Sequence, residues 1–410
     1  MERAELARLL GAPAGLLAEA RRETTVIEAG EPRQFMAELA AAAAQGGTVM
    51  LASNTWGENE RRQLAGLRQE EQVTPPTAAG KGWLCIPTGG TSGQLKFARH
   101  DEETLSAAVN GFARHFGVSQ VNAVGVLPLH HVSGLMAWMR CALTGGEYRP
   151  LDWKSVESGA LPPLPAKPEG WMISLVPTQL ERLLRRDGAV EWLRQFRLIL
   201  LGGGPSSPLL LDRVAAQRLP LSPGYGMTET AAMVTALRPA EFLAGARNCG
   251  AALPHARVKT GDDGAIILGG DSLFLGYHPH WRDRGDFATA DSGWLDAEQH
   301  LHVTGRHDAV IITGGEKVNP AEVEAALRAT GEFAEVVVLG VPDPEWGQAV
   351  IAAYPVADRP RLDKVAEMLS RSLAPAKRPK RFVPLALWPG NAQGKVDRAE
   401  VARRVAAANP

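Results

Sequence analysis

Cysteine is scarce in this sequence, and its placement favours neither a metal site nor a disulfide framework. The three cysteines, Cys85, Cys141 and Cys249, lie far apart, with no CxxC pair and no histidine cluster at the spacing of metal ligands. Three is also an odd number, so the thiols cannot all pair within one chain. These features predict reduced thiols in a cytoplasmic protein.

Long runs of one charge and long apolar runs are also absent. The net charge is -1 and there is no block of lysines and arginines, so the sequence offers no electrostatic footprint for nucleic acid or an anionic membrane. No apolar run approaches the roughly 20 residues of a membrane helix. Residues 1–20 resemble an amphipathic helix and lack the apolar core of a signal peptide. We therefore expect small-molecule partners, with no nucleic acid and no membrane.

What the sequence does contain is the composition of a globular protein with more than one domain. Its 410 residues are too many for one ordinary hydrophobic core, and 45% of them are apolar against 22% charged. Apolar runs typical of buried strands, at 121–129, 171–177 and 196–204, alternate with segments of helical period, which predicts α/β layers. The alanine-rich run at 36–44 is expected to be a packed helix.

The pattern changes toward the C-terminus. From about residue 250 the apolar runs are short and separated by turn residues, which is typical of a β-rich unit. The sequence predicts a large α/β body over 1–306 that includes this unit, and a small α+β domain over 307–410, with the boundary at 306–308. In the small domain we expect a strand, a helix and a strand, at 309–315, 320–330 and 334–342.

The stretch PTGGTSGQLKFARH at 87–100 is the first candidate for chemistry. An apolar strand, GWLCIP, precedes it and a helical pattern, DEETLSAAVNGFARHF, follows it. A glycine-rich loop between strand and helix can direct backbone N–H groups at an anion, and Lys96 would supply a counter-charge. The loop is not a Walker A sequence, in which the lysine directly follows the last glycine. On its own it is as often a plain turn as a phosphate site.

Four more stretches combine turn residues with charged or aromatic side chains. SPGYGMTET follows the strand and glycine run LILLGGGP, and sets Tyr225 and Glu229 around an expected tight turn. TADSGW isolates Asp291 between small residues. TGRHDAVIITGGEKVNP carries Arg306 and a second pair of glycines, and NAQGKVDR sets Lys395 directly after a glycine.

In order and spacing, these five motifs resemble the adenylate-forming superfamily of acyl-CoA synthetases, peptide-synthetase adenylation domains and luciferases. The resemblance runs from about residue 82 to residue 400. It implies a large N-terminal body followed by a small, mobile α+β domain. Within the superfamily, LPLHHVSG at 127–134 beside PTGGTSG, in an unusually short chain, is similar to the o-succinylbenzoate–CoA ligases of menaquinone and phylloquinone synthesis.

The resemblance implies an ATP site. The glycine-rich stretch would be the mobile loop over the β- and γ-phosphates, and the glycine run before Tyr225 would form the adenine slot, where a flat base can lie against the backbone. The alternative for the glycine run is an ordinary strand-to-helix turn. The implied phosphate-loop residues are Thr88, Gly89, Gly90, Thr91, Ser92, Gly93 and Lys96. The implied adenine-site residues are Gly202, Gly203, Gly204, Pro205, Tyr225 and Gly226.

Residues of the other motifs would complete that site. The resemblance assigns Thr228 to the α-phosphate and Glu229 to Mg²⁺, a hard cation that prefers carboxylate and phosphate oxygens. Asp291 would accept hydrogen bonds from the ribose hydroxyls, with Arg306 at the same sugar or at the phosphates. Two structural alternatives stay open: Glu229 as a helix-capping acid, and Asp291 with Arg306 as a buried ion pair.

A lysine and two histidines would serve the acid substrate. Lys395 would bridge the substrate carboxylate and the α-phosphate and stabilise the negative charge that builds during adenylation. His131 matches the family's position at the acid pocket, with His130 beside it and with Ser133 and Thr178 as further pocket residues. The alternative for each histidine is a packed position in the core.

The implied reaction has two steps, formation of an acyl-adenylate and then of a thioester with coenzyme A. Asp308 would be the hinge on which the small domain rotates between the steps, unless it is an ordinary linker acid. The rivals are an aryl- or acyl-CoA ligase for another acid, an adenylation enzyme that loads a carrier protein, and a binding homologue without activity. Only about 80 residues precede the phosphate loop, so we expect a reduced N-terminal part. The sequence predicts no oligomeric state.

Overall fold

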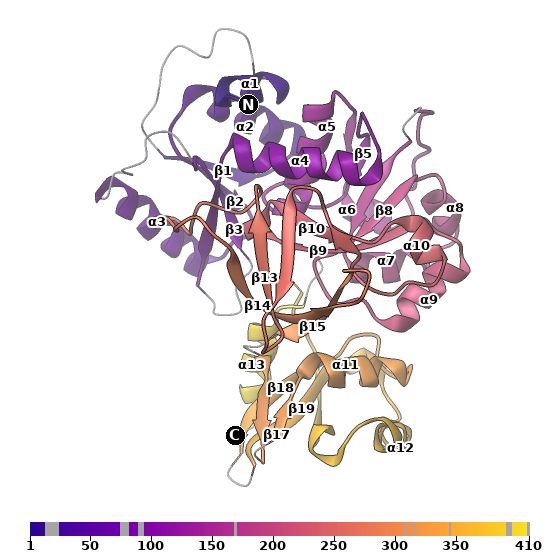
Figure 1. Ribbon diagram of the computed structural model, residues 1–410. Coiled ribbons are helices and arrows are strands. Elements are labelled where there is room, and N and C mark those ends of the chain that lie inside the picture. Colours follow the sequence, from indigo (N-terminus) through magenta and orange to yellow (C-terminus); the bar gives the residue numbers. More distant parts are fainter. Residues whose placement is uncertain are drawn as a thin grey trace.

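The computed structural model describes residues 1–12, 24–73, 82–88, 94–167, 170–306, 309–314, 316–343, 346–390 and 396–407. Figure 1 shows their arrangement. Three sheets of four, seven and four strands form a large body, and sheets of two and three strands with three helices gather at one end of the molecule. This arrangement confirms the predicted α/β class with a smaller α+β unit at the C-terminus. No described helix is long and apolar enough to cross a membrane.

The first sheet joins three parallel strands to one antiparallel strand, in the order β1-β2-β3-β4. The helix expected at 36–44 is confirmed as part of α2, where Leu39, Ala40 and Ala43 are buried. Of the helix expected in residues 1–20, the structure describes α1. The elements are α1 (Arg3–Leu9), β1 (Thr25–Ala29), α2 (Pro32–Gln45), β2 (Val49–Ser53), α3 (Glu58–Val73), β3 (Leu84–Thr88) and β4 (Lys96–His100).

The strand expected before the stretch 87–100 and the helix expected after it are confirmed as β3 and α4 (Glu102–Phe116), but the prediction missed the strand β4 between the glycines and that helix. β3 ends at Thr88 and β4 returns from Lys96, and these two residues face each other across the strands. The helix α4 begins only after β4. Phe97 is fully buried in the sheet, and this burial makes the short run KFARH a strand. The N-terminus of α4 therefore does not lie at the loop.

The second sheet has seven strands in the order β11-β10-β9-β8-β7-β5-β6. β7, β8 and β9 are parallel, so their carboxyl ends meet at one edge, where ligands of α/β sheets commonly bind. The strands expected at 121–129, 171–177 and 196–204 are confirmed, each shorter than its apolar run. The strands are β5 (Ala123–Gly125), β6 (Tyr148–Pro150), β7 (Met172–Leu175), β8 (Leu198–Leu201), β9 (Leu221–Met227), β10 (Ala232–Ala236) and β11 (Ala251–Ala252).

Helices cover this sheet because their apolar faces pack on its buried strands. The buried cluster that contains Ile173 and Leu201 includes side chains of short helices that follow the strands. The helices are α5 (Val132–Thr144), α6 (Trp153–Glu157), α7 (Pro177–Leu183), α8 (Ala189–Leu193), α9 (Pro208–Ala216) and α10 (Pro239–Leu243).

The β-rich unit expected from about residue 250 is confirmed as a four-stranded antiparallel sheet in the order β12-β13-β14-β15. In Figure 1 its strands β14 and β15 lie between the rest of the body and the C-terminal elements. The strands are β12 (Ala256–Thr260), β13 (Ala265–Gly270), β14 (Phe287–Leu295) and β15 (Leu301–Arg306).

The C-terminal unit has its own sheets and its own buried clusters, around Val338 and Val401. It contains the predicted succession of strand, helix and strand. The division at 306–308 stays a prediction, because residues 307 and 308 lie outside the described residues. The elements are β16 (Ile311–Thr313), β17 (Glu316–Val318), α11 (Pro320–Ala329), β18 (Val337–Asp343), β19 (Gly347–Pro355), α12 (Leu362–Ser372), β20 (Arg381–Leu385) and α13 (Arg398–Ala407).

Candidate active site

The carboxyl ends of β8 and β9 bring the glycine run beside Tyr225. Gly203 has a φ of 79°, a left-handed conformation that favours glycine. A Cβ added at Gly226 would lie 1.9 Å from the backbone oxygen of Ala232, so β9 and β10 approach too closely there for a side chain. Tyr225 lies in β9, and the expected tight turn follows it at Thr228–Thr230, between the antiparallel strands β9 and β10. The run is completed by Gly202, Gly204 and Pro205, which lie on the segment from β8 to α9.

Tyr225, Asp291 and Arg306 form one hydrogen-bonded group across two sheets. The Tyr225 hydroxyl donates to Asp291 Oδ2 at 2.6 Å, and Arg306 Nη1 lies 3.4 Å from Asp291 Oδ1. Asp291 and Arg306 are opposite residues of β14 and β15. Burial, followed by the charge of Asp291, raises the pKa of Tyr225 well above its usual value, so the phenol stays protonated. The ion-pair alternative is therefore present, but a carboxylate accepts about four hydrogen bonds, so these contacts do not exhaust Asp291.

Glu229 is a buried carboxylate in a short 3₁₀ turn, η2 (Thr228–Thr230). It is 6% exposed, and its Oε1 accepts a hydrogen bond from the Tyr277 hydroxyl at 2.5 Å. In the part of the chain that the structure describes, no basic side chain forms an ion pair with Glu229, and its side chain caps no helix. A buried charge without a counter-charge is costly. The residue therefore fits a hard divalent cation such as Mg²⁺, whose preferred ligands are oxygens.

The two tyrosine–carboxylate pairs belong to one site. Burial and then the charge of Glu229 raise the pKa of Tyr277, whereas the charge of Arg306 acts in the opposite direction. The charge of Glu229 also contributes to the raised pKa of Tyr225. Lys96 is exposed at the start of β4, with its Nζ 5.5 Å from the centroid of the Tyr277 ring. A cation thus lies at the margin of this group, on the strand that follows the glycine-rich stretch.

His100 supports the turn from the interior of the body. Its Nε2 lies 2.8 Å from the backbone oxygen of Thr228, and its Nδ1 lies 3.1 Å from Thr104 Oγ1. Burial lowers the pKa of His100 to about 4, so the ring is neutral near pH 7. Because a carbonyl oxygen can only accept a hydrogen bond, Nε2 carries the ring proton and donates a hydrogen bond to the backbone oxygen of Thr228. This bond fixes the backbone that positions Thr228 and Glu229.

His130 and His131 lie at the start of α5. Their ring centroids are 4.0 Å apart, with the rings tilted by 48°. His130 is 3% exposed and borders a cavity of about 180 Å³, with Ser53 among its other lining residues. Burial lowers the pKa of His130 to about 4, so this residue matches the packed-histidine alternative. His131 is partly exposed and precedes the first residue of α5.

The histidine loop and the Glu229 turn are neighbours. Ala231, two residues beyond Glu229, packs in one buried cluster with Leu129 and Leu135, which flank the histidines. The two other pocket residues of the prediction, Ser133 and Thr178, lie in the first turns of α5 and α7 and are partly exposed. A Cβ built on Gly204 would lie 3.9 Å from Pro177 Cδ, so the start of α7 also borders the glycine run.

Sequence reasoning missed Tyr277 and His100. Tyr277 follows Gly276, whose φ of 135° favours glycine, and a tyrosine directly after such a glycine was the available indication. For His100 there was no local indication in the sequence, because four of the five residues of KFARH are buried without alternation. Seven predicted residues, Gly89, Gly90, Thr91, Ser92, Gly93, Asp308 and Lys395, lie outside the described residues.

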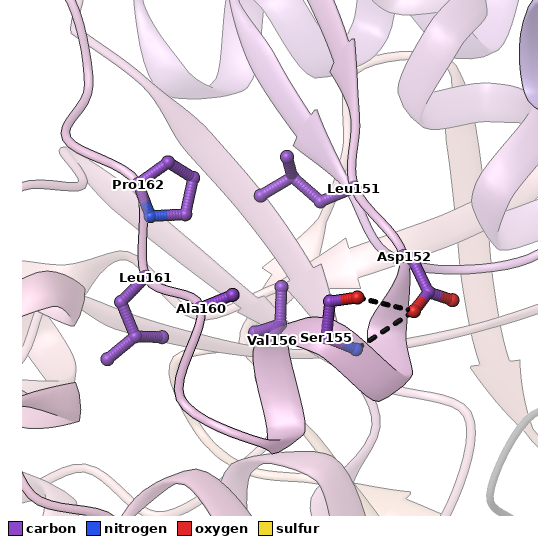
Figure 2. Close-up of a pocket in the computed structure, with 7 residues that line it drawn as sticks. All are labelled: Leu151, Asp152, Ser155, Val156, Ala160, Leu161 and Pro162. Carbon is purple, nitrogen blue, oxygen red and sulfur yellow. Dashed lines mark hydrogen bonds between the residues drawn. The ribbon is translucent and has the colours of Figure 1, made fainter.

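A cavity of about 350 Å³ beside α6 contains none of the predicted site residues (Figure 2). Its one carboxylate, Asp152, accepts hydrogen bonds from Ser155 N at 2.9 Å and from Ser155 Oγ at 2.8 Å. Asp152 is therefore used in capping α6. The cavity is lined by Leu151, Asp152, Ser155, Val156, Ala160, Leu161 and Pro162.

Comparison with known proteins agrees with this geometry. The chain matches the family described as AMP-binding enzyme over residues 13–278, and the AMP-binding enzyme C-terminal domain over residues 322–395. The o-succinylbenzoate CoA synthetase of Bacillus subtilis, in complex with its acyl-adenylate intermediate, superposes with a TM-score of 0.77 at 24% identity, covering 97% of this chain and 91% of that one. This likeness supports the fold.

Two of the relatives that are similar in sequence differ in the acid that their names give. The 2-succinylbenzoate–CoA ligase of Enterococcus faecalis is 33% identical over 326 residues, which cover 75% of this chain and 67% of that one. The indoleacetate–CoA ligase of Aromatoleum aromaticum is 32% identical over 364 residues, which cover 82% of this chain and 69% of that one. The resemblance inferred from the five motifs is thereby confirmed, and the chain belongs to the AMP-binding enzyme family.

Proposed function

We propose that this chain is an AMP-forming acid–CoA ligase that converts 2-succinylbenzoate to 2-succinylbenzoyl-CoA. In the first step a carboxylate oxygen of the acid attacks the α-phosphorus of ATP and releases pyrophosphate, which leaves an acyl-adenylate. In the second step the thiol of coenzyme A loses its proton, attacks the acyl carbon and releases AMP. The observation that carries the proposal is the presence of two tyrosine–carboxylate pairs, Tyr225–Asp291 and Tyr277–Glu229, in one site.

On the nucleotide side, the contacts seen in the protein would orient the base and sugar. The Tyr225 hydroxyl is held by Asp291, so the ring is fixed before a base packs against it and the glycine run. Less side-chain freedom is then lost on binding. The remaining lone pairs of Asp291 would accept hydrogen bonds from the ribose hydroxyls, and Arg306 would balance the charge of Asp291 or contact phosphate.

On the phosphate side, Thr88 and Lys96 flank the glycine-rich stretch that would cover the β- and γ-phosphates. Thr228 would donate a hydrogen bond to the α-phosphate from a turn that His100 holds in place. Glu229 would hold Mg²⁺, which when bound would offset the negative charge of the phosphates. The protein's own contribution is to fix these groups before the reaction begins.

On the acid side, the proposed pocket residues are His130, His131, Ser133 and Thr178. 2-Succinylbenzoate keeps a second carboxylate after the first is activated, and burying that charge without donors would cost several kcal/mol. His131, Ser133 and Thr178 are partly exposed polar residues at the starts of α5 and α7, with the buried His130 beside them. Such residues suit this substrate better than an alkyl chain. The similarity to the ligase of Enterococcus faecalis supports this choice of acid.

Two residues outside the described part of the chain complete the proposal. By its match to the family motif, Lys395 would bridge the substrate carboxylate and the α-phosphate during adenylation. Asp308 would be the hinge on which the C-terminal unit turns before coenzyme A attacks.

The test is pyrophosphate release from ATP with a panel of acids, with and without coenzyme A. We expect a kcat/KM for 2-succinylbenzoate at least about 100-fold above those for benzoate, octanoate and indoleacetate, a margin of about 2.7 kcal/mol. Indoleacetate is the stringent comparison because a relative named for it is similar to this chain. If indoleacetate matches or exceeds 2-succinylbenzoate, the acid assignment is wrong. Adenylate formation without any thioester in the presence of coenzyme A would instead indicate a carrier-protein acceptor.

A further inference from the structure

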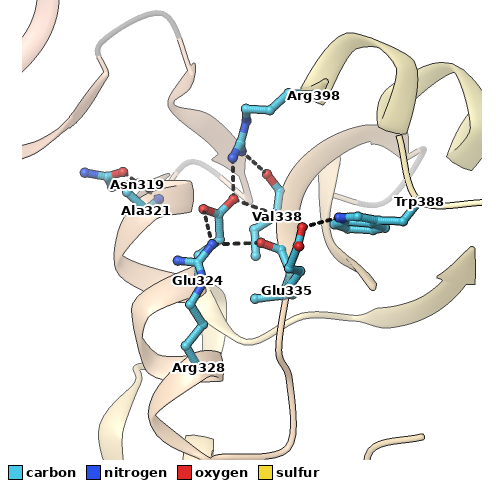
Figure 3. Close-up of polar contacts among 9 residues, drawn as sticks. Asn319, Ala321, Glu324, Arg328, Glu335, Val338, Trp388 and Arg398 are labelled. Atoms are coloured by element: carbon cyan, nitrogen blue, oxygen red, sulfur yellow. Dashed lines mark hydrogen bonds and ion pairs between the residues drawn. The ribbon is translucent and has the colours of Figure 1, made fainter. Parts of the chain in front are cut away.

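Glu335 touches both the large body and the segment that leads to Lys395. It lies in the C-terminal unit between α11 and β18. Its Oε2 accepts a hydrogen bond from Trp388 Nε1, and Figure 3 shows the two side chains pointing toward each other. Its Oε1 lies 3.8 Å from Arg182 Nη2, which belongs to α7 of the large body. One carboxylate therefore connects the two parts of the molecule.

The described residues on either side of 391–395 are held by contacts within the C-terminal unit. Trp388 is held by Glu335 on the N-terminal side. On the C-terminal side, Arg398 Nη1 lies 2.6 Å from Glu324 Oε1, and Arg398 Nη2 donates to the backbone oxygen of Val338 at 2.7 Å. Gly390 and Val396 form a β-bridge. The positions of Trp388 and Arg398 are therefore set by contacts with α11, β18 and the residue Glu335 between them.

Further contacts hold α11 against the body near the proposed nucleotide groups. Asn319 Nδ2 donates to the backbone oxygen of Thr304 at 2.8 Å, and a Cβ on Gly305 would lie 2.7 Å from the Asn319 side chain. These residues directly precede Arg306 on β15. α11 also contacts α9, the helix that follows the glycine run. The unit thus rests on the elements that carry the nucleotide-side residues.

We propose that Glu335 is a positioning residue that holds the C-terminal unit on α7 in the arrangement that forms the acyl-adenylate. The inference rests on the proposed function, in which adenylation needs Lys395 near the α-phosphate. Glu335 orients Trp388 and, through Arg182, orients the whole unit relative to the body. Because the ion pair must break when the unit rotates for thioester formation, its loss affects the two half-reactions differently.

The expected effect is modest because the pair is partly exposed, with side-chain exposures of 46% for Arg182 and 22% for Glu335. Pairs of this kind change an equilibrium by up to about fivefold. Glu335→Gln removes the charge but keeps an oxygen that can accept from Trp388. Arg182→Met removes the charge from the other side. Each should slow acyl-adenylate formation about threefold to fivefold and leave thioester formation from supplied acyl-adenylate unchanged or faster.

The double variant and two controls make the test specific. Arg182→Met with Glu335→Gln should be no slower than either single variant, since both remove the same interaction. Glu157→Gln removes the other ion pair of Arg182, at 3.1 Å within the body, and should leave the ratio of half-reaction rates unchanged. Glu322→Gln removes a pair with Lys377 inside the C-terminal unit and should do the same. Additive single effects, or equal losses in both half-reactions, would overturn the proposal.

A second measurement does not depend on turnover. Amide hydrogen exchange in the full chain should be faster at 333–336 in Arg182→Met than in Glu157→Gln, because only the first variant loses the contact to Glu335. Equal exchange in the two variants would contradict the positioning role. Failure of the proposed function looks different: the parent chain would then release no pyrophosphate with any acid of the panel, while the exchange result would still decide on the contact.

Discussion

Two buried glutamates, one in each part of the molecule, are held in opposite ways. Glu324 in α11 is 2% exposed, and its carboxylate accepts from Arg398 at 2.6 Å and from the backbone N–H of Val338 at 2.8 Å. Arg328 lies 3.5 Å from its other oxygen, as Figure 3 shows. Glu229 is 6% exposed and accepts from one phenol, without an ion pair in the described part of the chain.

The difference lies in charge balance, because both side chains are buried. The chain itself neutralises Glu324 with two arginines, and the resulting network ties α11, β18 and α13 together. Glu229 forms no ion pair with any described basic side chain and accepts one hydrogen bond, from Tyr277. A buried carboxylate whose charge is balanced indicates a structural role, whereas one that lacks a counter-charge indicates a place for a cation. The buried glutamate of the C-terminal unit thus has its counter-charges within the unit, whereas the one in the body can take a cationic ligand.

The largest effect we expect concerns Lys395, the one residue of the C-terminal unit that we propose takes part in adenylation. Lys395→Ala should slow acyl-adenylate formation about 1000-fold, because the charge that builds during adenylation loses its counter-charge. Thioester formation from supplied acyl-adenylate should stay within about twofold of the parent rate, since the lysine serves only the first step. Rapid-quench measurement of the two half-reactions decides the point. Equal losses in both would show that the unit contributes more than this residue.

The ion-pair network of Glu324 should affect the free energy of unfolding and not the reaction rate. Glu324→Gln leaves Arg398 and Arg328 without a counter-charge and turns an N–H group toward their donors, so we expect a loss of about 3 kcal/mol in the free energy of unfolding. Urea unfolding of the full chain measures it. Glu322→Gln, which breaks a more exposed pair with Lys377, is the matched control and should cost less than about 1 kcal/mol. Equal effects of the two variants would remove the distinction between Glu324 and an ordinary surface pair.

Substitution of Glu229 should affect the reaction rate and leave the free energy of unfolding nearly unchanged. Glu229→Gln keeps an oxygen for the Tyr277 hydroxyl but removes the charge, so we expect kcat/KM to fall at least about 100-fold, or about 2.7 kcal/mol. The free energy of unfolding should change by less than about 1 kcal/mol, because no ion pair of the described residues is broken. A large loss of stability with little loss of activity would make Glu229 a structural residue like Glu324.

The sequence was sufficient for the strand runs of the second sheet and for the family motifs, because apolar runs and short glycine-containing motifs are local features. It was insufficient where contacts between residues far apart in the sequence determine a strand or a site. KFARH became a strand because Phe97 is buried against the first sheet, and no local pattern predicts that burial. Tyr277 reaches Glu229 from 48 residues away, so the pair could not be recognised from spacing. The same holds for the contact of Glu335 with Arg182.

The two parts should also respond differently to acid. In the body, burial lowers the pKa values of His100, His130 and His255 to about 4, below the ordinary value of 6.5. Between these values the unfolded chain takes up protons that the folded chain does not, so the free energy of unfolding falls as the pH drops from 6.5 toward 4. Each of the three histidines contributes up to about 1.4 kcal/mol per pH unit.

Apart from His307 at its predicted boundary, the C-terminal unit contains no histidine, so it has no buried histidine of this kind among its described residues. The pKa of Glu332 is lowered to about 2, first by hydrogen bonds from Arg361 and then by Lys364, so this carboxylate stays ionised through the same window. Hydrogen exchange of the full chain at pH 7 and pH 5, corrected for intrinsic rates, should show protection falling in α4 and α5 before α11. Earlier loss in α11 would mean that the histidines do not govern the acid response.

The smallest expected effect separates the charge of Glu229 from its hydrogen bond. Tyr277→Phe removes the donor at 2.5 Å but leaves the carboxylate, so the side chain loses one orienting contact and keeps its charge. A hydrogen bond to a charged group is worth about 1.5 kcal/mol, so we expect kcat/KM to fall about tenfold. The Mg²⁺ concentration for half-maximal rate should rise while the maximal rate at saturating Mg²⁺ recovers, because a correctly charged but less ordered ligand still binds the ion. In Glu229→Gln that recovery should be absent. If Tyr277→Phe were as damaging as Glu229→Gln at every Mg²⁺ concentration, the phenol and not the unbalanced charge would carry the function of this turn.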